Sequence, residues 1–295
     1  ARSGKRLRPV LCLLCCQAAG GDPAQALPAA AALELVHNFS LVHDDIEDGS
    51  HTRRGQRAVW SIWGLAHGIN VGDGLFVLAR LALHRLGDRD VPPHRQQAAM
   101  LALDQACLAL CEGQYVDMTL EDHLDVDLDQ YFWMIRHKTA ALLAASMQLG
   151  AIIATDDQDR IRHYYRFGEN LGMAFQIQDD ILGAWGDEQE TGKSAATDIR
   201  DKKKTLPVVY ALNRRAEDKD ARELAELYAL DGPLDPDGIG SVLAILDRVD
   251  ARQYAEEIAE AYYLQALQGL EATGIANAAQ SHLRALAASL VGRTA

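Results

Sequence analysis

Apolar residues recur along this chain every three or four positions, which is the spacing of amphipathic helices, and strand-like alternation is rare. Only 8 of the 295 residues are proline, and Ala and Leu are abundant, which also favours helices. Pro9 and Pro23 stand where first-turn prolines belong, and Asp127 and Asp156 are suitable N-caps. The pattern predicts helices over Pro9–Ala19, Pro23–Asp48, Gly68–Leu86, Pro93–Tyr115, Asp127–Thr155, Asp156–Trp185, Thr205–Arg215, Lys219–Leu230, Gly238–Ala272 and Ala276–Leu290.

The connectors between these segments are short, and neither a linker nor a repeat period divides the chain. We therefore expect one all-α domain over residues 1–295, a bundle of about ten helices. Several segments are apolar on more than one face, which predicts that some helices are buried at the centre of the bundle. Because the chain opens at Ala1 rather than at Met, we expect its start to derive from a longer precursor.

Acidic residues outnumber basic ones by 42 to 29, which gives a formal net charge of -13. Broad binding of nucleic acid needs basic surface to neutralise phosphates, so this charge argues against a nucleic-acid partner. The longest apolar run, Val10–Cys16, covers seven residues, far short of the ~20 that a membrane span needs. All five cysteines lie in apolar, helical stretches without the histidine pairs of a zinc site, which favours core residues in a reducing, cytoplasmic environment.

The first concentration of reactive side chains ends the second predicted helix, in the run Asp44-Asp45-Ile46-Glu47-Asp48. Asp44 and Asp48 are four residues apart, so they project from one face with Cβ atoms ~5–6 Å apart. Two carboxylates at this spacing repel each other unless a cation lies between them. A solvated helix end is the alternative interpretation. A calcium loop does not fit, because Ile46 occupies a required ligand position and no Glu stands at the twelfth place.

A second acidic pair, Asp179-Asp180, stands near the end of the predicted helix Asp156–Trp185 and follows an apolar stretch. If the two helices run side by side, both acidic motifs could face one cavity and hold several hard cations between them. Mg2+ suits such a site, since it takes few carboxylates, keeps water and completes its shell with phosphate oxygens.

Basic residues occur beside these acidic motifs, where a phosphate-bearing substrate would need them. In a chain this acidic they indicate a diphosphate clamp, with Arg giving forked contacts and Lys point charges. Surface ion pairs are the alternative, and Lys138 fits that alternative least because apolar residues follow it. The basic candidates are Lys5, Arg8, Arg53, Arg54, Lys138, Lys193, Lys202, Lys203 and Lys204.

Together these motifs resemble those of the trans-isoprenyl diphosphate synthases, the polyprenyl synthetase family. The resemblance implies an all-α fold of the type I isoprenoid synthase kind, with helices around a central cavity, and a homodimer. Beyond Leu212 it is only that of generic helices. The segments that carry it, in the family's order and spacing, are Gly4-Lys5-Arg6-Leu7-Arg8-Pro9, Asp44-Asp45-Ile46-Glu47-Asp48, Thr52-Arg53-Arg54-Gly55, Lys138-Thr139, Gln176-Ile177-Gln178-Asp179-Asp180, Thr191-Gly192-Lys193 and Lys203-Lys204-Thr205-Leu206-Pro207.

The resemblance implies a role for each matching residue. Three Mg2+ ions are expected, with Mn2+ as a substitute, and the implied ligands are Asp44, Asp48 and Asp179, with Asp45 and Asp180 as further candidates. The residues implied to hold the allylic diphosphate are Arg53, Lys138, Lys193 and Lys203, with Lys202 close enough to compete. Those implied to hold isopentenyl diphosphate are Lys5, Arg8, His37 and Arg54. The implied catalytic residues are Lys138, Thr139 and Gln176, of which Thr139 and Gln176 are implied to lie near the reacting carbons.

The implied reaction is a Mg2+-dependent, head-to-tail (1′-4) condensation of isopentenyl diphosphate with an allylic diphosphate. Metal ions and basic residues stabilise the departing diphosphate, and the double bond of isopentenyl diphosphate attacks the resulting allylic cation. The released diphosphate, or a nearby group, then removes a proton from the condensed cation to form the new double bond. One residue departs from the family pattern, because Gly183 stands where a third Asp is expected. We expect activity to survive this change, with an altered metal affinity.

Product length depends on what blocks the cavity beside the helix that carries Asp44. Phe39 lies five residues before Asp44, ~7.5 Å along the helix axis, where a ring would stop a growing prenyl tail and Ser40 would not. A core aromatic is the alternative interpretation of Phe39. An aromatic residue here resembles the geranylgeranyl diphosphate synthases, so we expect a C20 product, with C15 as second choice.

Two other functions are open. A class I terpene cyclase shares the metal-triggered ionisation and the helical fold, but it needs no site for isopentenyl diphosphate, and the residues implied to form one are present. A non-catalytic modulating subunit of a heteromeric prenyl synthase would fit the incomplete second motif, although it has no use for the other binding residues.

Overall fold

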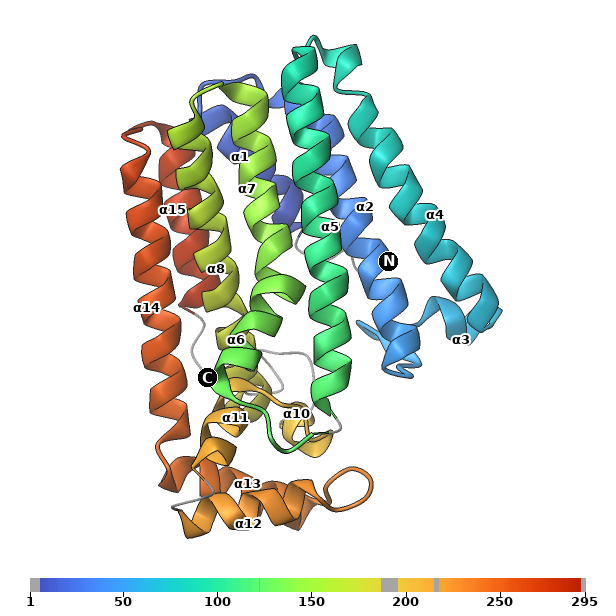
Figure 1. Ribbon diagram of the computed structural model, residues 1–295, viewed down its shortest axis with the longest axis vertical. Coiled ribbons are helices and arrows are strands. Elements are labelled where there is room, and N and C mark those ends of the chain that lie inside the picture. Colours follow the sequence, from blue (N-terminus) through green and yellow to red (C-terminus); the bar gives the residue numbers. More distant parts are fainter. Residues whose placement is uncertain (1–5, 122, 187–195, 215–217, 293–295) are drawn as a thin grey trace. The chain divides into compact units, whose positions relative to one another are not determined.

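The computed structural model describes residues 6–121, 123–186, 196–214 and 218–292. These residues form an all-α fold, as predicted, with one pair of two-residue strands (Figure 1). The first elements are α1 (Leu7–Ala18), α2 (Pro23–Glu47), β1 (Thr52–Arg53), β2 (Gln56–Arg57), α3 (Val59–Trp63), α4 (Leu65–His84), η1 (Gly87–Arg89) and α5 (Pro93–Glu121). They are followed by α6 (Leu128–Ile135), η2 (Arg136–Ala140), α7 (Ala141–Ala154), α8 (Gln158–Trp185), α10 (Thr197–Arg200), α11 (Leu206–Asn213), α12 (Lys219–Tyr228), α13 (Pro236–Arg248), α14 (Ala251–Ala272) and α15 (Ala278–Val291).

Two of the predicted helices are divided in the structure. The segment predicted as Asp127–Thr155 is α6 and α7 joined by the π-helical turn η2, whose longer hydrogen-bonded ring interrupts the regular helix. The segment predicted as Gly238–Ala272 is α13 and α14. Asp250 between them has a φ of 57°, a left-handed conformation that ends α13 and that Asp tolerates better than most residues.

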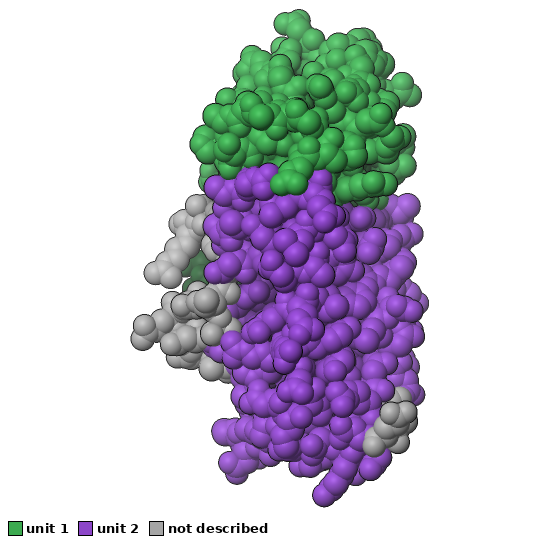
Figure 2. Space-filling view, turned by 90° about the vertical axis from the view of Figure 1, so that its left-hand side faces the viewer, with its two compact units in different colours: residues 1–107, 142–168, 269–283 green, residues 108–141, 169–268, 284–295 purple. Residues whose placement is uncertain are grey.

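The chain folds into two compact units that alternate along the sequence (Figure 2). Unit 1 comprises residues 1–107, 142–168 and 269–283, and unit 2 comprises residues 108–141, 169–268 and 284–295. Helices α5, α7, α8, α14 and α15 contribute residues to both units. The single domain expected from the short connectors stays a prediction.

In unit 1, α2 packs against α1 and α4. Its N-terminus is fixed by Asp22, whose side chain accepts a hydrogen bond from the Ala24 N–H at 2.9 Å, and by Pro23 in the first turn. Three cysteines of α1 are fully buried, and burial raises the pKa of the Cys16 thiol to about 11, so it stays neutral. None of the five cysteines, all of them within the described ranges, forms a disulfide. Four are buried, which confirms core positions for all but the exposed Cys111.

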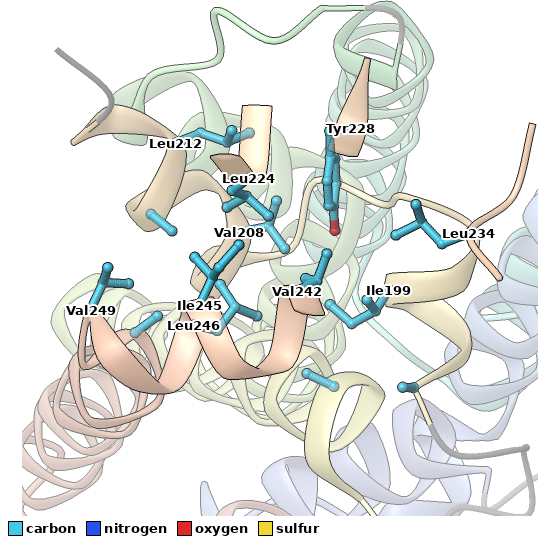
Figure 3. Packing of buried hydrophobic residues seen from close by; sticks show 14 residues of the cluster. Ile199, Val208, Leu212, Leu224, Tyr228, Leu234, Val242, Ile245, Leu246 and Val249 are labelled. Carbon is cyan, nitrogen blue, oxygen red and sulfur yellow. The ribbon is translucent and has the colours of Figure 1, made fainter. Parts of the chain in front are cut away.

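Unit 2 has two hydrophobic clusters. Figure 3 shows the cluster that α10, α11, α12 and α13 form with the loop residue Leu234. Its labelled members are Ile199, Val208, Leu212, Leu224, Tyr228, Leu234, Val242, Ile245, Leu246 and Val249. The other cluster joins α6, α8, α11 and α14 and includes Tyr131, Ile177 and Leu206. These two cores fix the ends of α8 and α11, from which several candidate site residues project.

A helix that crosses a bilayer needs about 20 predominantly apolar residues. None of the described helices combines that length with that apolar character.

Candidate active site

The first acidic motif occupies the C-terminal end of α2, in unit 1. The Asp48 N–H donates to the Asp44 carbonyl at 2.8 Å, so the helical geometry continues through the motif and the two side chains stand one turn apart. Asp44 is half-buried and Asp48 is exposed. Asp45 differs from both, because it is only 4% exposed and its Oδ1 accepts a hydrogen bond from Arg53 Nε at 2.6 Å.

A hairpin of β1 and β2 positions the arginine pair. The two strands are antiparallel, and Arg54 and Gly55 form the two-residue turn between them, with φ angles of 53° and 72°. Positive φ at both turn residues gives the twist that a tight hairpin prefers, which explains a Gly at the second position. The hairpin therefore holds Arg53 against Asp45 and leaves Arg54 exposed.

Three guanidinium groups act on His37, which lies on α2. Burial lowers the pKa of His37 to about 2, and the positive charges of Arg8, Arg54 and Arg53 contribute in the same direction. The ring is therefore neutral at physiological pH and offers one donor and one acceptor without adding charge. The structure thus brings together three of the four residues expected at the isopentenyl diphosphate, with Arg53 beside them. The fourth, Lys5, lies outside the described residues.

Arg8 is a half-buried cation on α1. Burial lowers its pKa to about 10, the negative charge of Glu34 works against this shift, and the positive charge of Arg54 adds to it. Its buried Nε has no hydrogen-bond partner among the described residues. A buried N–H group without a partner is costly, so this position favours an anion that would accept from it.

Phe39 and Ser40 lie on α2 in buried positions, 7% and 8% exposed. The ring of Phe39 is 4.9 Å from that of Phe76 on α4 and 5.6 Å from that of His43, centroid to centroid. Phe39 therefore faces α4, and Ser40 donates to the His37 carbonyl at 2.9 Å. This packing is compatible both with a core aromatic and with a block to chain growth.

In unit 2, the turn η2 carries Lys138 and Thr139. The ammonium group of Lys138 forms an ion pair with Asp117 of α5. Thr139 Oγ1 donates to Gln176 Oε1 of α8 at 2.8 Å, so the structure places these two predicted site residues in contact. A Cβ on Gly113 would fall within 2.7 Å of backbone atoms of His137 and Lys138, so α5 can approach this turn only through a glycine.

Asp180 of the second motif is a buried hydrogen-bond acceptor. Its Oδ2 accepts from the Tyr131 hydroxyl at 2.5 Å and from the Leu206 N–H at 2.8 Å, and its Oδ1 accepts from Gln176 Nε2 at 2.9 Å. Burial raises the pKa of Asp180 to about 7, while these hydrogen bonds favour the charged form. Asp179 is exposed. The second Asp of each motif is thus bonded within the protein.

The three consecutive lysines before α11 differ in their surroundings. Lys202 donates to the Leu230 carbonyl, and Lys204 donates to the Glu121 carbonyl at 3.1 Å. Lys203 is exposed, which makes it the most accessible of the three to a diphosphate. Lys193 lies outside the described residues.

Sequence reasoning missed two residues of this region, Asp117 and Tyr131. An ionised lysine in an apolar segment needs a counter-ion, so Lys138 could have indicated that an acidic partner exists, although not which one. No comparable signal points to Tyr131, because a tyrosine on an amphipathic helix is an ordinary core residue.

Comparisons with known proteins identify the family. The model of the polyprenyl synthetase family matches residues 1–246. A geranylgeranyl diphosphate synthase of Mycobacterium tuberculosis is 46% identical over 226 residues, which are 77% of this chain and 63% of that protein. The match therefore spans less than two thirds of that relative. A (2E,6E)-farnesyl diphosphate synthase of Mycobacterium bovis is 36% identical over 99% of this chain and 80% of its own length.

Solved structures give the same answer for the fold. Geranylgeranyl pyrophosphate synthetase from Pyrococcus horikoshii has a TM-score of 0.90 at 37% identity, covering 99% of this chain and 86% of its own. Geranylgeranyl pyrophosphate synthase from Corynebacterium glutamicum, in complex with isoprenyl diphosphate and magnesium, has a TM-score of 0.88 at 28% identity over 99% and 87%. The fold is that of the all-α isoprenoid synthases, and the chain belongs to the polyprenyl synthetase family of trans-prenyltransferases, the isoprenyl diphosphate synthases.

Proposed function

We propose that this protein condenses isopentenyl diphosphate head to tail with an allylic diphosphate and releases inorganic diphosphate, in a Mg2+-dependent reaction. The observation that carries the proposal is the cationic group around His37, in which Arg8, Arg53 and Arg54 act on one neutral ring. Three guanidinium groups that close together repel one another, and a diphosphate relieves that repulsion with forked hydrogen bonds. The unmatched Nε of Arg8 is one donor that such an anion would satisfy.

Asp44, Asp48 and Asp179 are the proposed Mg2+ ligands. Carboxylate oxygens are the donors that Mg2+ prefers; Asp44 is half-buried and the other two are exposed, whereas Asp45 and Asp180 are buried in protein contacts. Within the described ranges no three Asp, Glu, His or Cys side chains lie close enough to hold a metal by themselves. Mg2+ binds through one or two carboxylates and completes its octahedron with water and phosphate oxygens. When bound, the metal neutralises charge that develops on the departing diphosphate.

The basic residues divide between the two substrates. Lys5, Arg8, His37 and Arg54 are proposed to hold isopentenyl diphosphate, with His37 acting as a neutral donor. Arg53, Lys138, Lys193 and Lys203 are proposed to hold the allylic diphosphate. Arg53 and Lys138 are paired with Asp45 and Asp117, and these carboxylates fix the two cations in one orientation before substrate arrives.

Thr139 and Gln176 are proposed to lie near the reacting carbons. The Thr139 hydroxyl donates its proton to Gln176 Oε1, so the lone pairs of Oγ1 are left to face positive charge. A fixed oxygen dipole stabilises an allylic cation without capturing it as a nucleophile, because the hydroxyl stays protonated and hydrogen-bonded.

We propose a C20 product, with C15 as the second choice. The relatives named above include both a geranylgeranyl and a farnesyl diphosphate synthase, so they do not distinguish these lengths. Support for a block near C20 comes from Phe39, whose ring is buried against Phe76. A packed aromatic ring resists displacement by a growing chain better than an isolated one.

A second copy of the chain is the proposed partner, and the cytoplasm is the proposed location. On α4, Ala79 and Leu83 are buried, while Val77, Leu78 and Leu81 are each more than half exposed. A self-complementary apolar face is typical of a two-fold homodimer interface. The five cysteines, none of which forms a disulfide, support a reducing compartment.

The test is turnover by the purified chain with isopentenyl diphosphate and C5, C10 or C15 allylic starters. We expect consumption of both substrates with Mg2+, weaker activity with Mn2+, and none with EDTA. A terpene cyclase would consume the allylic substrate and leave isopentenyl diphosphate untouched. A modulating subunit would turn over neither alone. Asp44→Asn and Asp179→Asn should each lose roughly 100-fold or more in kcat, whereas the surface variant Asp201→Asn should match the parent.

A further inference from the structure

Gly183 lies one turn after Asp179 on α8, and so on the same side of that helix. A Cβ built on Gly183 would stand 2.9 Å from the carboxyl carbon of Asp198 and 3.3 Å from its Cβ, with Oδ2 closer still. Real side chains do not approach that closely. The carboxylate of Asp198 therefore fills the space in which any side chain at position 183 would begin.

The backbone of Asp198 is held firmly in place. Its carbonyl accepts from the Lys203 N–H at 2.9 Å, and the next residue, Ile199, is fully buried in the cluster with Val242 and Leu234 (Figure 3). The Leu234 N–H donates to the Arg200 carbonyl at 2.9 Å, which ties the far end of α10 to the same cluster. A side chain at position 183 would therefore rotate the Asp198 side chain away from α8, because these contacts hold the Asp198 backbone in place.

The Asp198 carboxylate makes no hydrogen bond or ion pair within the described ranges that would account for its place against α8. It stands against Gly183, one turn further along α8 than Asp179. Two nearby carboxylates repel each other, and a cation relieves the repulsion. A carboxylate therefore stands one turn beyond Asp179 along α8, beside the second motif. It belongs to Asp198 of α10 and not to α8 itself.

We propose that Asp198 supplies the carboxylate that the family pattern places at position 183, and that Gly183 is the residue that makes room for it. This inference rests on the proposed function and assigns Asp198 to the Mg2+–diphosphate site beside Asp179. Gly183 is then a positioning residue rather than a lost ligand. Restoring an Asp at position 183 therefore weakens the site, because two carboxylates compete for one space.

The experiment removes the carboxylate at position 198, introduces one at position 183, or does both. Mg2+ binding is titrated calorimetrically in the presence of inorganic diphosphate, which requires no turnover, and kcat and half-saturating Mg2+ are measured alongside. The site variants are Asp198→Asn, Gly183→Ala, Gly183→Asp and the double variant Gly183→Asp with Asp198→Ala. Two controls match them chemically. Asp201→Asn alters a surface carboxylate already paired with Arg200, and Gly240→Ala adds a Cβ in α13 where nothing lies within 4 Å.

We expect Asp198→Asn, Gly183→Ala and Gly183→Asp each to weaken Mg2+ binding roughly 10- to 100-fold, the usual cost of disturbing the groups around a metal. Both controls should stay within about twofold of the parent. The double variant should bind Mg2+ more tightly than Gly183→Asp alone, because only the carboxylate at position 183 then occupies this space. Purely structural roles would lower the melting temperature without this reciprocal rescue.

Either of two results would overturn the proposal: Asp198→Asn binding Mg2+ like Asp201→Asn, or Gly183→Asp binding Mg2+ more tightly than the parent. If the Gly183 variants do not fold, Asp198→Asn decides alone, since it keeps the volume of the side chain. A parent protein that binds Mg2+ with diphosphate in an Asp198-dependent way but does not consume isopentenyl diphosphate would refute the proposed function and leave the role of Asp198 standing.

Discussion

Two buried tyrosines of unit 2 allow the same substitution to be tested with opposite expected signs. Tyr131 is 1% exposed and donates its hydroxyl proton to the buried carboxylate of Asp180 at 2.5 Å. Tyr228 is 6% exposed, and its hydroxyl has no hydrogen-bond partner among the described residues. Tyr131→Phe should therefore lower the free energy of unfolding by about 1.5–3 kcal/mol, the value of a hydrogen bond to a charged group. Tyr228→Phe should be neutral or raise it by about 1 kcal/mol.

Urea denaturation at pH 8 in EDTA measures both changes. One fixed protein concentration keeps any contribution from self-association the same for every variant. Asp180→Asn completes a double-mutant cycle with Tyr131→Phe. In the Asp180→Asn background, Tyr131→Phe should lower the free energy of unfolding by only about 1 kcal/mol, the value of a neutral hydrogen bond. Equal costs for the two tyrosine variants would refute the reasoning, since they would show that the partner of the hydroxyl does not matter. An unchanged cost of Tyr131→Phe in the Asp180→Asn background would do the same.

Other contacts give three further predictions. Burial raises the pKa of Asp180 from 3.8 to about 7, so the folded state prefers its protonated form; the stability that this form contributes is full below pH 3.8 and is lost as pH rises to about 7. As the pH rises through that window, the urea midpoint of the parent should therefore fall relative to that of Asp180→Asn. Midpoints of the two proteins that change in parallel with pH would contradict this. Gly113→Ala should cost roughly 1–3 kcal/mol and lower kcat, because the added Cβ strikes the backbone that carries Lys138; an unchanged melting temperature would contradict it. Phe39→Ala should give products longer than those of the parent and of Phe39→Leu by chromatography, and an unchanged profile would show that Phe39 does not set the product length.

The helices could be predicted because their apolar faces repeat at the helical period, a property of each segment alone. The turn η2 was not predicted. In the structure, α5 approaches this turn at Gly113, 25 residues before Lys138, and a local pattern carries no information on such a contact. The break at Asp250 carried only a weak signal, since Asp is one of several residues that tolerate the left-handed conformation. Local patterns therefore located helices well and missed the interruptions that depend on tertiary contacts or on one residue's φ.

The candidate site shows the same division between local and tertiary information. Sequence alone pointed to the acidic and basic motifs, because carboxylates and cations in apolar surroundings need an explanation. It could not show that Asp45 would pair with Arg53, or that Asp198 would stand against Gly183. The first contact depends on the hairpin, and the second joins residues 15 positions apart on two different helices. Composition and spacing identify which residues are chemically unusual, and only the fold shows which of them are already satisfied.

The two acidic motifs are built alike, and helix geometry explains why. Adjacent residues on a helix point about 100° apart, so when one Asp of a pair faces outward the next tends to face the protein. A carboxylate that faces the protein interior needs hydrogen-bond donors around it. Arg53 donates to Asp45. The donors to Asp180 are Tyr131, Gln176 and the Leu206 N–H. Changes at Asp45 or Asp180 should therefore act mainly on stability, through buried donors left without an acceptor. Changes at Asp44 or Asp179 should act mainly on Mg2+ dependence, because these are the two carboxylates of the pairs that are proposed to bind the metal.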